Sequence, residues 1–258
     1  MDGRRQPHID LFVLATPTLA DADLAACAAC LDAGERARAQ RLPEGATRRD
    51  FIAAHGLARF ALSRIDPATP PAGWRFRTGA SGKPSVIGTS GVTGAPDLRV
   101  SLTHTRDLVA VAVAEGMELG VDAERTVPAH ASAETAAVFC TAREAQALAA
   151  IGDTQARSRQ FFALWTLKES LLKALGTGFA RAPQSVGCTL DPLSVVECFP
   201  GAWHAWHVPF GDHHHLALAA ESPGVAPHLS AHALRAIADL AAGAAPLVLE
   251  PVAFRPPA

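Results

Sequence analysis

Two acidic residues separated by one position stand near the middle of the chain, in the segment Gly120-Val121-Asp122-Ala123-Glu124. If this segment is a strand, its period of two places Asp122 and Glu124 on one face and the apolar neighbours on the other. Carboxylates so close together repel each other unless positive charge lies between them. Magnesium, which takes oxygen ligands and often joins one or two carboxylates to substrate phosphates, is the natural candidate. The alternative is two solvated acids, or one acid paired with Arg125.

A second group of reactive side chains lies in the run from Trp165 to Lys173. In a helix, Trp165, Glu169 and Lys173 follow one another at intervals of four residues and lie nearly on one face. An adjoining stripe of leucines can dock this helix on a sheet, namely Leu164, Leu167, Leu171 and Leu175. A glutamate and a lysine one turn apart also form an ordinary helix ion pair worth about 0.3–0.5 kcal/mol, which is the alternative interpretation.

Taken together, the two segments closely resemble a known family. G-V-D-x-E followed by F-x-x-x-W-T-x-K-E-S-x-x-K is similar to the paired signature of the 4′-phosphopantetheinyl transferases, in the two-lobed Sfp-type class that activates peptide and polyketide synthases. Ser81-Gly82-Lys83-Pro84 resembles the family's G-K-P turn, and Ser101-Leu102-Thr103-His104-Thr105 resembles its N-h-S-H-S strand end. The resemblance runs from about residue 35 to residue 180, and its paired blocks are the specific part.

The resemblance implies roles for the acidic and basic residues of the paired blocks. Asp122, Glu124 and Glu169 match the acids that hold magnesium on the pyrophosphate of coenzyme A. The metal neutralises charge that would repel a nucleophile and stabilises the 3′,5′-ADP leaving group. Lys173 matches the lysine that binds the pyrophosphate, and Lys168 flanks the same site. Glu169 also matches the general base, which takes the proton of a carrier serine directly or through a water.

Further matches concern the nucleotide end of coenzyme A. Thr103 and His104 match the groups that hold the 3′-phosphate, with Arg38 as a helper. Lys83 and Pro84 match the turn that lines the adenine pocket. These five residues complete the predicted binding site.

The chain departs from the family pattern at Glu35, where a basic residue commonly helps to hold the 3′-phosphate. Nearby arginines could compensate, and the segment from residue 36 to residue 64 is rich in them: Arg36, Arg38, Arg41, Arg48, Arg49, Arg59 and Arg64. Such a segment is either a solvated helix face or a surface for phosphate or an acidic partner. Since carrier proteins of this kind are acidic, we expect part of it to belong to a docking face.

Two other groups of residues are interpreted as structural. Cys27 and Cys30 form a CxxC inside a helical run, with no second cysteine pair nearby, and buried small hydrophobes explain them better than a redox or zinc site. The three consecutive histidines 213–215 cannot all face one metal from a strand, so we expect a polar turn that precedes a strand.

The elements that must position these residues follow from apolar periodicity. We expect strands at 9–14, 74–77, 85–87, 98–103, 108–114, 118–124, 203–208 and 215–220, and helices at 21–41, 46–65, 142–151, 157–175 and 232–240. Residues 105–107 are predicted to form a tight hairpin connection. Thr141 and Glu144 form a capping box, and Gly176 is predicted to end the long helix in a left-handed conformation.

The predicted fold is α+β, with two similar lobes related by a pseudo-twofold axis, each a small, mostly antiparallel sheet packed with helices. The expected division is an N-terminal lobe at residues 1–117 for the 3′-phosphate and adenine, a C-terminal lobe at 118–241 for the magnesium and catalytic motifs, and a tail at 242–258. Coenzyme A would bind in the cleft between the lobes, and two fused lobes would allow a monomer to act.

Composition narrows the remaining possibilities. The chain has 258 residues, of which 49% are hydrophobic and 19% charged, as in an ordinary globular protein. A formal net charge of −2 argues against a nucleic-acid binder. The absence of a long apolar run or of an N-terminal leader pattern favours a cytoplasmic protein without a membrane span.

The expected activity is a magnesium-dependent transfer of phosphopantetheine from coenzyme A to a serine of an apo acyl or peptidyl carrier protein. Two rivals stay open: a catalytically silent module that binds carrier proteins or coenzyme A, and a magnesium-dependent phosphodiesterase.

Overall fold

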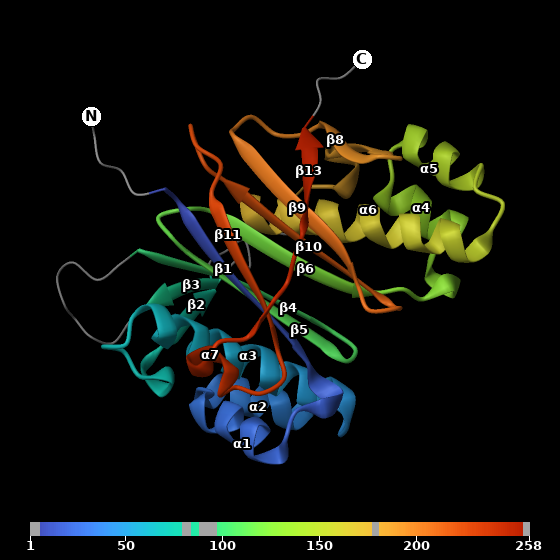
Figure 1. The fold of residues 1–258 in the computed structure, drawn as a ribbon. Helices are drawn as coiled ribbons and strands as arrows, with labels where there is room; N and C mark the ends of the chain where they lie inside the picture. The colour runs from blue at the N-terminus through green and yellow to red at the C-terminus, as the bar shows by residue number, and fades with distance from the viewer. Residues whose placement is uncertain (1–5, 79–83, 88–96, 177–180, 255–258) are drawn as a thin grey trace.

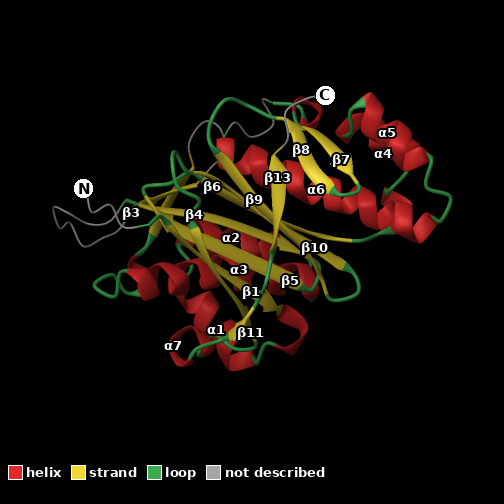
Figure 2. Ribbon diagram, turned by 45° about the horizontal axis from the view of Figure 1, so that its top comes forward, coloured by secondary structure: helices red, strands yellow, loops and turns green. Residues whose placement is uncertain are grey.

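The computed structural model describes residues 6–78, 84–87, 97–176 and 181–254 (Figure 1). Two main sheets lie in the middle of the molecule, with α1, α2 and α3 on one side and α4, α5 and α6 on the other (Figure 2). The predicted two-lobed α+β fold is therefore confirmed.

The first lobe is built on a sheet with the strand order β12-β11-β1-β5-β4. Its strands are β1 (His8–Ala15), β4 (Leu98–Thr105), β5 (Leu108–Glu115), β11 (His228–Leu234) and β12 (Ala245–Pro246). Its helices are α1 (Asp21–Cys30), α2 (Ala33–Arg41), α3 (Ala46–Ile65) and α7 (Asp239–Ala242), and β2 (Arg75–Thr78) pairs with β3 (Pro84–Ile87) in a separate ribbon. The expected hairpin joins β4 to β5, with Asp107 in a left-handed conformation at φ 73°.

The second lobe is built on a sheet with the strand order β6-β10-β9-β13-β8-β7. Its strands are β6 (Leu119–Arg125), β7 (Gly187–Leu190), β8 (Leu193–Glu197), β9 (Trp203–Phe210), β10 (His214–Glu221) and β13 (Glu250–Phe254). Its helices are α4 (Ala133–Phe139), α5 (Ala142–Ala149) and α6 (Thr154–Leu175). The predicted capping box starts α5, and Gly176 ends α6 at φ 72°, as expected.

Alternating side chains explain how the layers pack. On β1 and β5, Leu11 and Ala112 face the second sheet, where Val121 of β6 and Leu218 of β10 meet them in a shared core. The other face of the first sheet packs against α3, and that of the second sheet packs against α6. A strand that is buried on both faces has nearly all apolar residues, which is why β5 reads LVAVAVAE.

Two sequence predictions about the end of the chain are wrong. Residues 232–240 do not form one helix, because β11 runs to Leu234 and pairs in parallel with β1, and only Asp239–Ala242 is helical. The segment expected to be a tail instead supplies β12 to the first sheet and β13 to the second. The segment H-A-L-R-A-I-A-D-L has high helix propensity, and tertiary pairing with β1 overrides it.

The stretch predicted as one helical region at 21–41 is divided. Asp32 separates α1 from α2 and caps α2, accepting a hydrogen bond from the Glu35 amide at 2.8 Å.

No helix in the described part of the chain has the length and apolarity needed to cross a bilayer.

Candidate active site

The edge strands of the two sheets, β4 and β6, lie together and hold Asp122 between the lobes. The Val121 amide donates to the Ser101 hydroxyl at 3.0 Å, and the Thr103 hydroxyl donates to Asp122 Oδ1 at 3.2 Å. Asp122 is only 4% exposed. The Asp122 carboxylate is therefore buried where the lobes meet, unlike the solvated acid of the alternative interpretation.

Helix α6 brings a lysine to this carboxylate. Lys173 Nζ lies 2.6 Å from Asp122 Oδ1 and donates a second hydrogen bond to the Val121 carbonyl at 3.2 Å. The Lys173 side chain stays one-third exposed, so its ammonium group has access to solvent on one side. The paired segments of the sequence thus meet as predicted.

Gly120 allows this close approach of helix and strand. A Cβ atom added at Gly120 would overlap the Ser170 carbonyl oxygen and the Ala174 amide nitrogen, both in the backbone of α6. A glycine at this position therefore sets how close Glu169 and Lys173 come to the acids of β6.

The acids around Asp122 carry more negative charge than the described neighbours neutralise. Burial, followed by the charge of Asp122, raises the pKa of Glu124 to about 8, and Lys173 only partly opposes this. Burial and Asp122 also raise the pKa of Glu169, again against the influence of Lys173. The three predicted metal ligands are thus close enough to interact through their charges.

The donor chemistry of this cluster fits a hard divalent cation. All three side chains offer carboxylate oxygens, and Asp122 Oδ2 is buried without a hydrogen-bond partner among the residues that the structure describes. Yet no three His, Cys, Asp or Glu side chains of the described chain are gathered tightly enough to hold a metal ion as they stand. Lys173 supplies the nearest positive charge, so a metal ion could bind here only if side chains moved.

A group of basic and aromatic side chains lies beside the acids, on the α3 side of β4. The ring of His104 meets the edge of Phe51 with centroids 6.2 Å apart, and the Arg38 guanidinium lies 5.3 Å from the Phe51 centroid. The His55 ring lies tilted against Phe51, with centroids 4.2 Å apart. Loss of water around the ring, followed by the positive charges of His55, Lys173 and Arg38, lowers the pKa of His104 to about 4, although one side of the ring stays open to solvent. Basic side chains grouped in this way are suited to binding an anion.

Glu35, the departure from the family pattern, does not face this group as an uncompensated charge. Its Oε2 lies 2.7 Å from Nη2 of the fully buried Arg59, and its Oε1 lies 2.8 Å from His55 Nδ1. Burial alone would raise the pKa of Glu35, but the hydrogen bonds from His55 and Asp32 and the charge of Arg59 outweigh it and lower the pKa to about 2. The acid therefore anchors α2 to α3.

We expect Glu35→Gln to destabilise the protein at neutral pH by roughly 3 kcal/mol, the free energy equivalent to its pKa shift. Because the folded-state pKa is lower than the ordinary value of 4.5, this stabilisation is complete above about pH 4.5 and disappears as the pH falls toward 2. Urea unfolding at pH 7 and pH 3 would measure it, with Glu44→Gln, 88% exposed, as the control. A stability difference that does not change with pH would contradict the assignment.

Two predicted binding residues have partners in the structure other than those that the resemblance implies. Lys168 is fully buried on another face of α6, where its Nζ pairs with Glu144 Oε2 at 2.6 Å, so it does not flank the pyrophosphate site. Thr103 neighbours His104 on a strand, so the two side chains point to opposite faces, and the Thr103 hydroxyl is engaged by Asp122. Lys83 lies outside the described residues, and Pro84 is described only as the first residue of β3.

Most arginines of the first lobe have structural partners. Arg49 donates to the carbonyls of Thr16 and Leu19, and Arg64 donates to that of Leu240. Arg36 and Arg48 likewise donate to backbone carbonyls, and Arg59 is buried against Glu35. Of the seven arginines, Arg38 and Arg41 remain as exposed candidates for the predicted docking face.

The cysteines and histidines behave as interpreted. Cys27 and Cys30 are buried free thiols, and Cys27 packs against Gly56 of α3. The turn before β10 includes His213, and His215 is buried beside His207, with a ring nitrogen distance of 3.1 Å.

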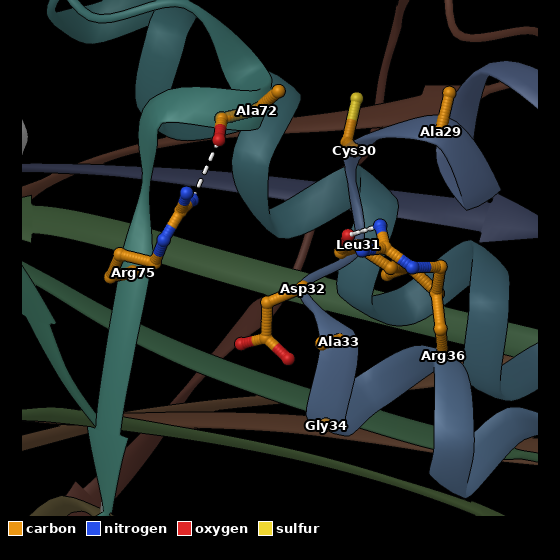
Figure 3. A pocket seen from close by; sticks show the side chains of 9 residues that line it. All are labelled: Ala29, Cys30, Leu31, Asp32, Ala33, Gly34, Arg36, Ala72 and Arg75. Atoms are coloured by element: carbon orange, nitrogen blue, oxygen red, sulfur yellow. Dashed lines mark hydrogen bonds between the residues drawn. The ribbon is translucent and has the colours of Figure 1, made fainter.

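A surface pocket of about 570 Å³ opens where α1 meets α2. Figure 3 shows its two arginines turned toward backbone carbonyls, Arg36 to Leu31 and Arg75 to Ala72. None of the predicted site residues lines it. Its cations already have partners, so this pocket is not the candidate active site.

Sequence reasoning missed three residues that shape the site. Glu144 was identified only as part of a capping box, but in the structure it is the buried partner of Lys168. His55 lies within the Arg-rich helix and was given no role in the site. Phe51, at the centre of the basic group, was not named as a candidate.

Comparison with known proteins shows which family the chain belongs to. The model of the 4′-phosphopantetheinyl transferase superfamily matches residues 118–221, which include β6, α6 and β10. The 4′-phosphopantetheinyl transferase HetI of Nostoc sp. (strain PCC 7120) is 32% identical over 170 residues, covering 66% of this chain and 69% of HetI. The protein slr0495 of Synechocystis sp. (strain PCC 6803), provisionally named a 4′-phosphopantetheinyl transferase, is 28% identical over 152 residues, covering 59% of each chain. The chain belongs to the 4′-phosphopantetheinyl transferase superfamily.

Proposed function

We propose that this protein transfers the 4′-phosphopantetheine group of coenzyme A to a serine of an apo acyl or peptidyl carrier protein and releases 3′,5′-ADP. One observation carries the proposal: Asp122 of β6 meets Lys173 of α6 where the lobes join, with one carboxylate oxygen left unpartnered among the described residues. Family membership supports the same activity.

The acidic group and the basic group would bind different parts of coenzyme A. His104 and Arg38, beside Phe51, would bind the 3′-phosphate. Lys173 would bind the pyrophosphate and leave Asp122 as it does so. Since its two lobes provide both groups, a single chain could act as a monomer.

Glu169 would act as the general base. The carrier serine oxygen would form a bond to the β-phosphorus of coenzyme A, the bond from that phosphorus to the bridging oxygen would break, and 3′,5′-ADP would leave with the bond electrons. The serine proton would pass to the Glu169 carboxylate, directly or through a water. Its half-buried position beside Asp122 favours a raised pKa, which suits a base that works near neutral pH.

Asp122, Glu124 and Glu169 would hold a magnesium ion. When bound, magnesium supplies positive charge that offsets the pyrophosphate and the leaving group. Lys173 would then no longer be the nearest positive charge to the acids.

We expect His104→Ala to weaken the binding of coenzyme A about tenfold to hundredfold, because a hydrogen bond to a charged group contributes about 1.5–3 kcal/mol. The affinity for 3′-dephospho-coenzyme A should stay unchanged, since the 3′-phosphate is missing. Titration calorimetry with both ligands measures the difference. The control is His130→Ala, at an exposed histidine of the second lobe. Equal losses for the two ligands would show that His104 does not bind the 3′-phosphate.

Incubation with an apo-carrier, coenzyme A and magnesium tests the function itself. Transfer adds the mass of phosphopantetheine to the carrier and produces 3′,5′-ADP in equal amount. Cleavage of coenzyme A without a carrier would indicate a phosphodiesterase instead. Binding of either partner without any product would indicate a silent binding module.

A further inference from the structure

A fully buried ion pair lies one residue from the proposed general base. Lys168 Nζ is 2.6 Å from Glu144 Oε2, and both side chains are 1% exposed. The pair is not part of the site described above, because Lys168 is on another face of α6.

The hydrogen bonds of the pair join four elements. Glu144 accepts from the amide of Thr141 at the start of α5 at 2.7 Å and from the amide of Cys188 in β7 at 2.7 Å. Lys168 donates to the carbonyl of Phe139, the last residue of α4, at 3.1 Å. The pair therefore fixes α6 against α4, α5 and β7 at a single point.

A buried ion pair contributes little net stability, because the cost of removing two charges from water offsets their attraction. Such a pair can instead hold the elements around it in a defined orientation. Consecutive residues of a helix point about 100° apart, so Lys168 directed toward α4 and α5 fixes where Glu169 points. A shift of the pair would turn Glu169 with it.

Two further contacts hold the same part of α6. The Phe139 ring stacks on Trp165 at 3.7 Å, one turn before Glu169. On the opposite side, Gly120 of β6 meets the helix backbone at Ser170 and Ala174. Helix α6 is thus held from both sides over the turn that carries Glu169.

We propose that Glu144 and Lys168 are positioning residues, which hold α6 in the rotation that directs Glu169 toward Asp122 and Glu124. The inference rests on the proposed function. It assigns to Lys168 a role in place of coenzyme A binding.

The test replaces both members of the pair by neutral side chains of similar size, in Glu144→Gln with Lys168→Met. We expect kcat to fall about tenfold to hundredfold, as for a misplacement of the base by about 1 Å. The KM for coenzyme A should stay within about threefold, since the pair does not touch the proposed ligand site. The affinity for Mn²⁺ added alone, followed by electron paramagnetic resonance, should weaken about tenfold, because a displaced Glu169 is lost as a ligand.

Leu62→Ala is the matched control, because it removes a fully buried side chain from the core of the first lobe, away from α6. All proteins are compared below their thermal midpoints. If the double variant does not fold, Glu144→Asp takes its place: it keeps the charge, shortens the side chain, and should lower kcat about fivefold.

Wild-type kcat and Mn²⁺ affinity in the folded variant would overturn the inference, as would equal losses in Leu62→Ala. If the wild-type protein transfers nothing to any apo-carrier, the proposed function fails, and the Mn²⁺ titration still decides whether the pair positions Glu169.

Discussion

Asp122→Asn is expected to lower kcat for phosphopantetheine transfer at least about a thousandfold while the fold survives. The variant removes the charge that pairs with Lys173 and the oxygen Oδ2 that has no described partner. A loss of three factors of ten corresponds to about 4 kcal/mol in the activation barrier, which is reasonable for a carboxylate at the centre of the acidic group. Product formation followed by mass spectrometry of the carrier measures the change.

Asparagine is preferable to alanine at this position. Asp122 is buried, and its Oδ1 accepts from Thr103 and Lys173, so truncation would take an acceptor away from both donors. The amide side chain of the variant keeps an acceptor oxygen there, and the thermal midpoint should change little. Asp97→Asn is the control, because Asp97 is 64% exposed and pairs with Arg99 away from the site. Turnover within tenfold of the wild-type protein would remove Asp122 from the proposed mechanism.

Gly120→Ala is expected to destabilise the protein strongly. The added methyl group would overlap backbone atoms of α6, which cannot move aside as a flexible side chain can. Forcing atoms into a packed core costs about 1–3 kcal/mol, and more where backbone has to move, so we expect roughly 3 kcal/mol. For a chain of this size the thermal midpoint should fall by about 6–12 °C.

Activity should fall in the same variant at temperatures where it is still folded, because α6 carries Glu169 and Lys173. Gly152→Ala provides the control, since a Cβ atom there meets nothing within 4 Å. Calorimetric scanning and a transfer assay of both variants test the two effects separately. An unchanged midpoint in Gly120→Ala would mean that the helix does not pack so closely on β6.

Local sequence patterns predicted the elements that carry their own signals. Helix α3 was predicted with its observed bounds, and the left-handed Gly176 and the capping box of α5 have strong local chemistry. β11 could not be recognised, because its alternation is weak and its last residues continue into an alanine-rich segment. Its pairing with β12 and its parallel pairing with β1, more than 200 residues away in the chain, make it a strand.

Part of the candidate site could also be predicted, because residue spacing within one element is itself a local pattern. The acids at 122 and 124 and the lysine at 173 were chosen by spacing within one element, and the structure brings Asp122 and Lys173 together. Lys168 and Thr103 were placed by resemblance alone, and the helix and strand periods direct them elsewhere. Their partners, Glu144 and Asp122, come from other elements, so spacing along the sequence could not identify the contacts.

The last strands of the chain have a consequence for how the protein is made. β11 lies inside the first sheet and β13 lies inside the second, so the first sheet is complete only after β12, at residue 246, and the second only after β13, at residue 254. On the ribosome, β1 must wait for β11 with one edge unpaired, and an open strand edge of this kind invites aggregation. An N-terminal fragment cut between β5 and β6 would lack β11 and β12 of the first sheet, so the first lobe is expected to fold only when the end of the chain is present.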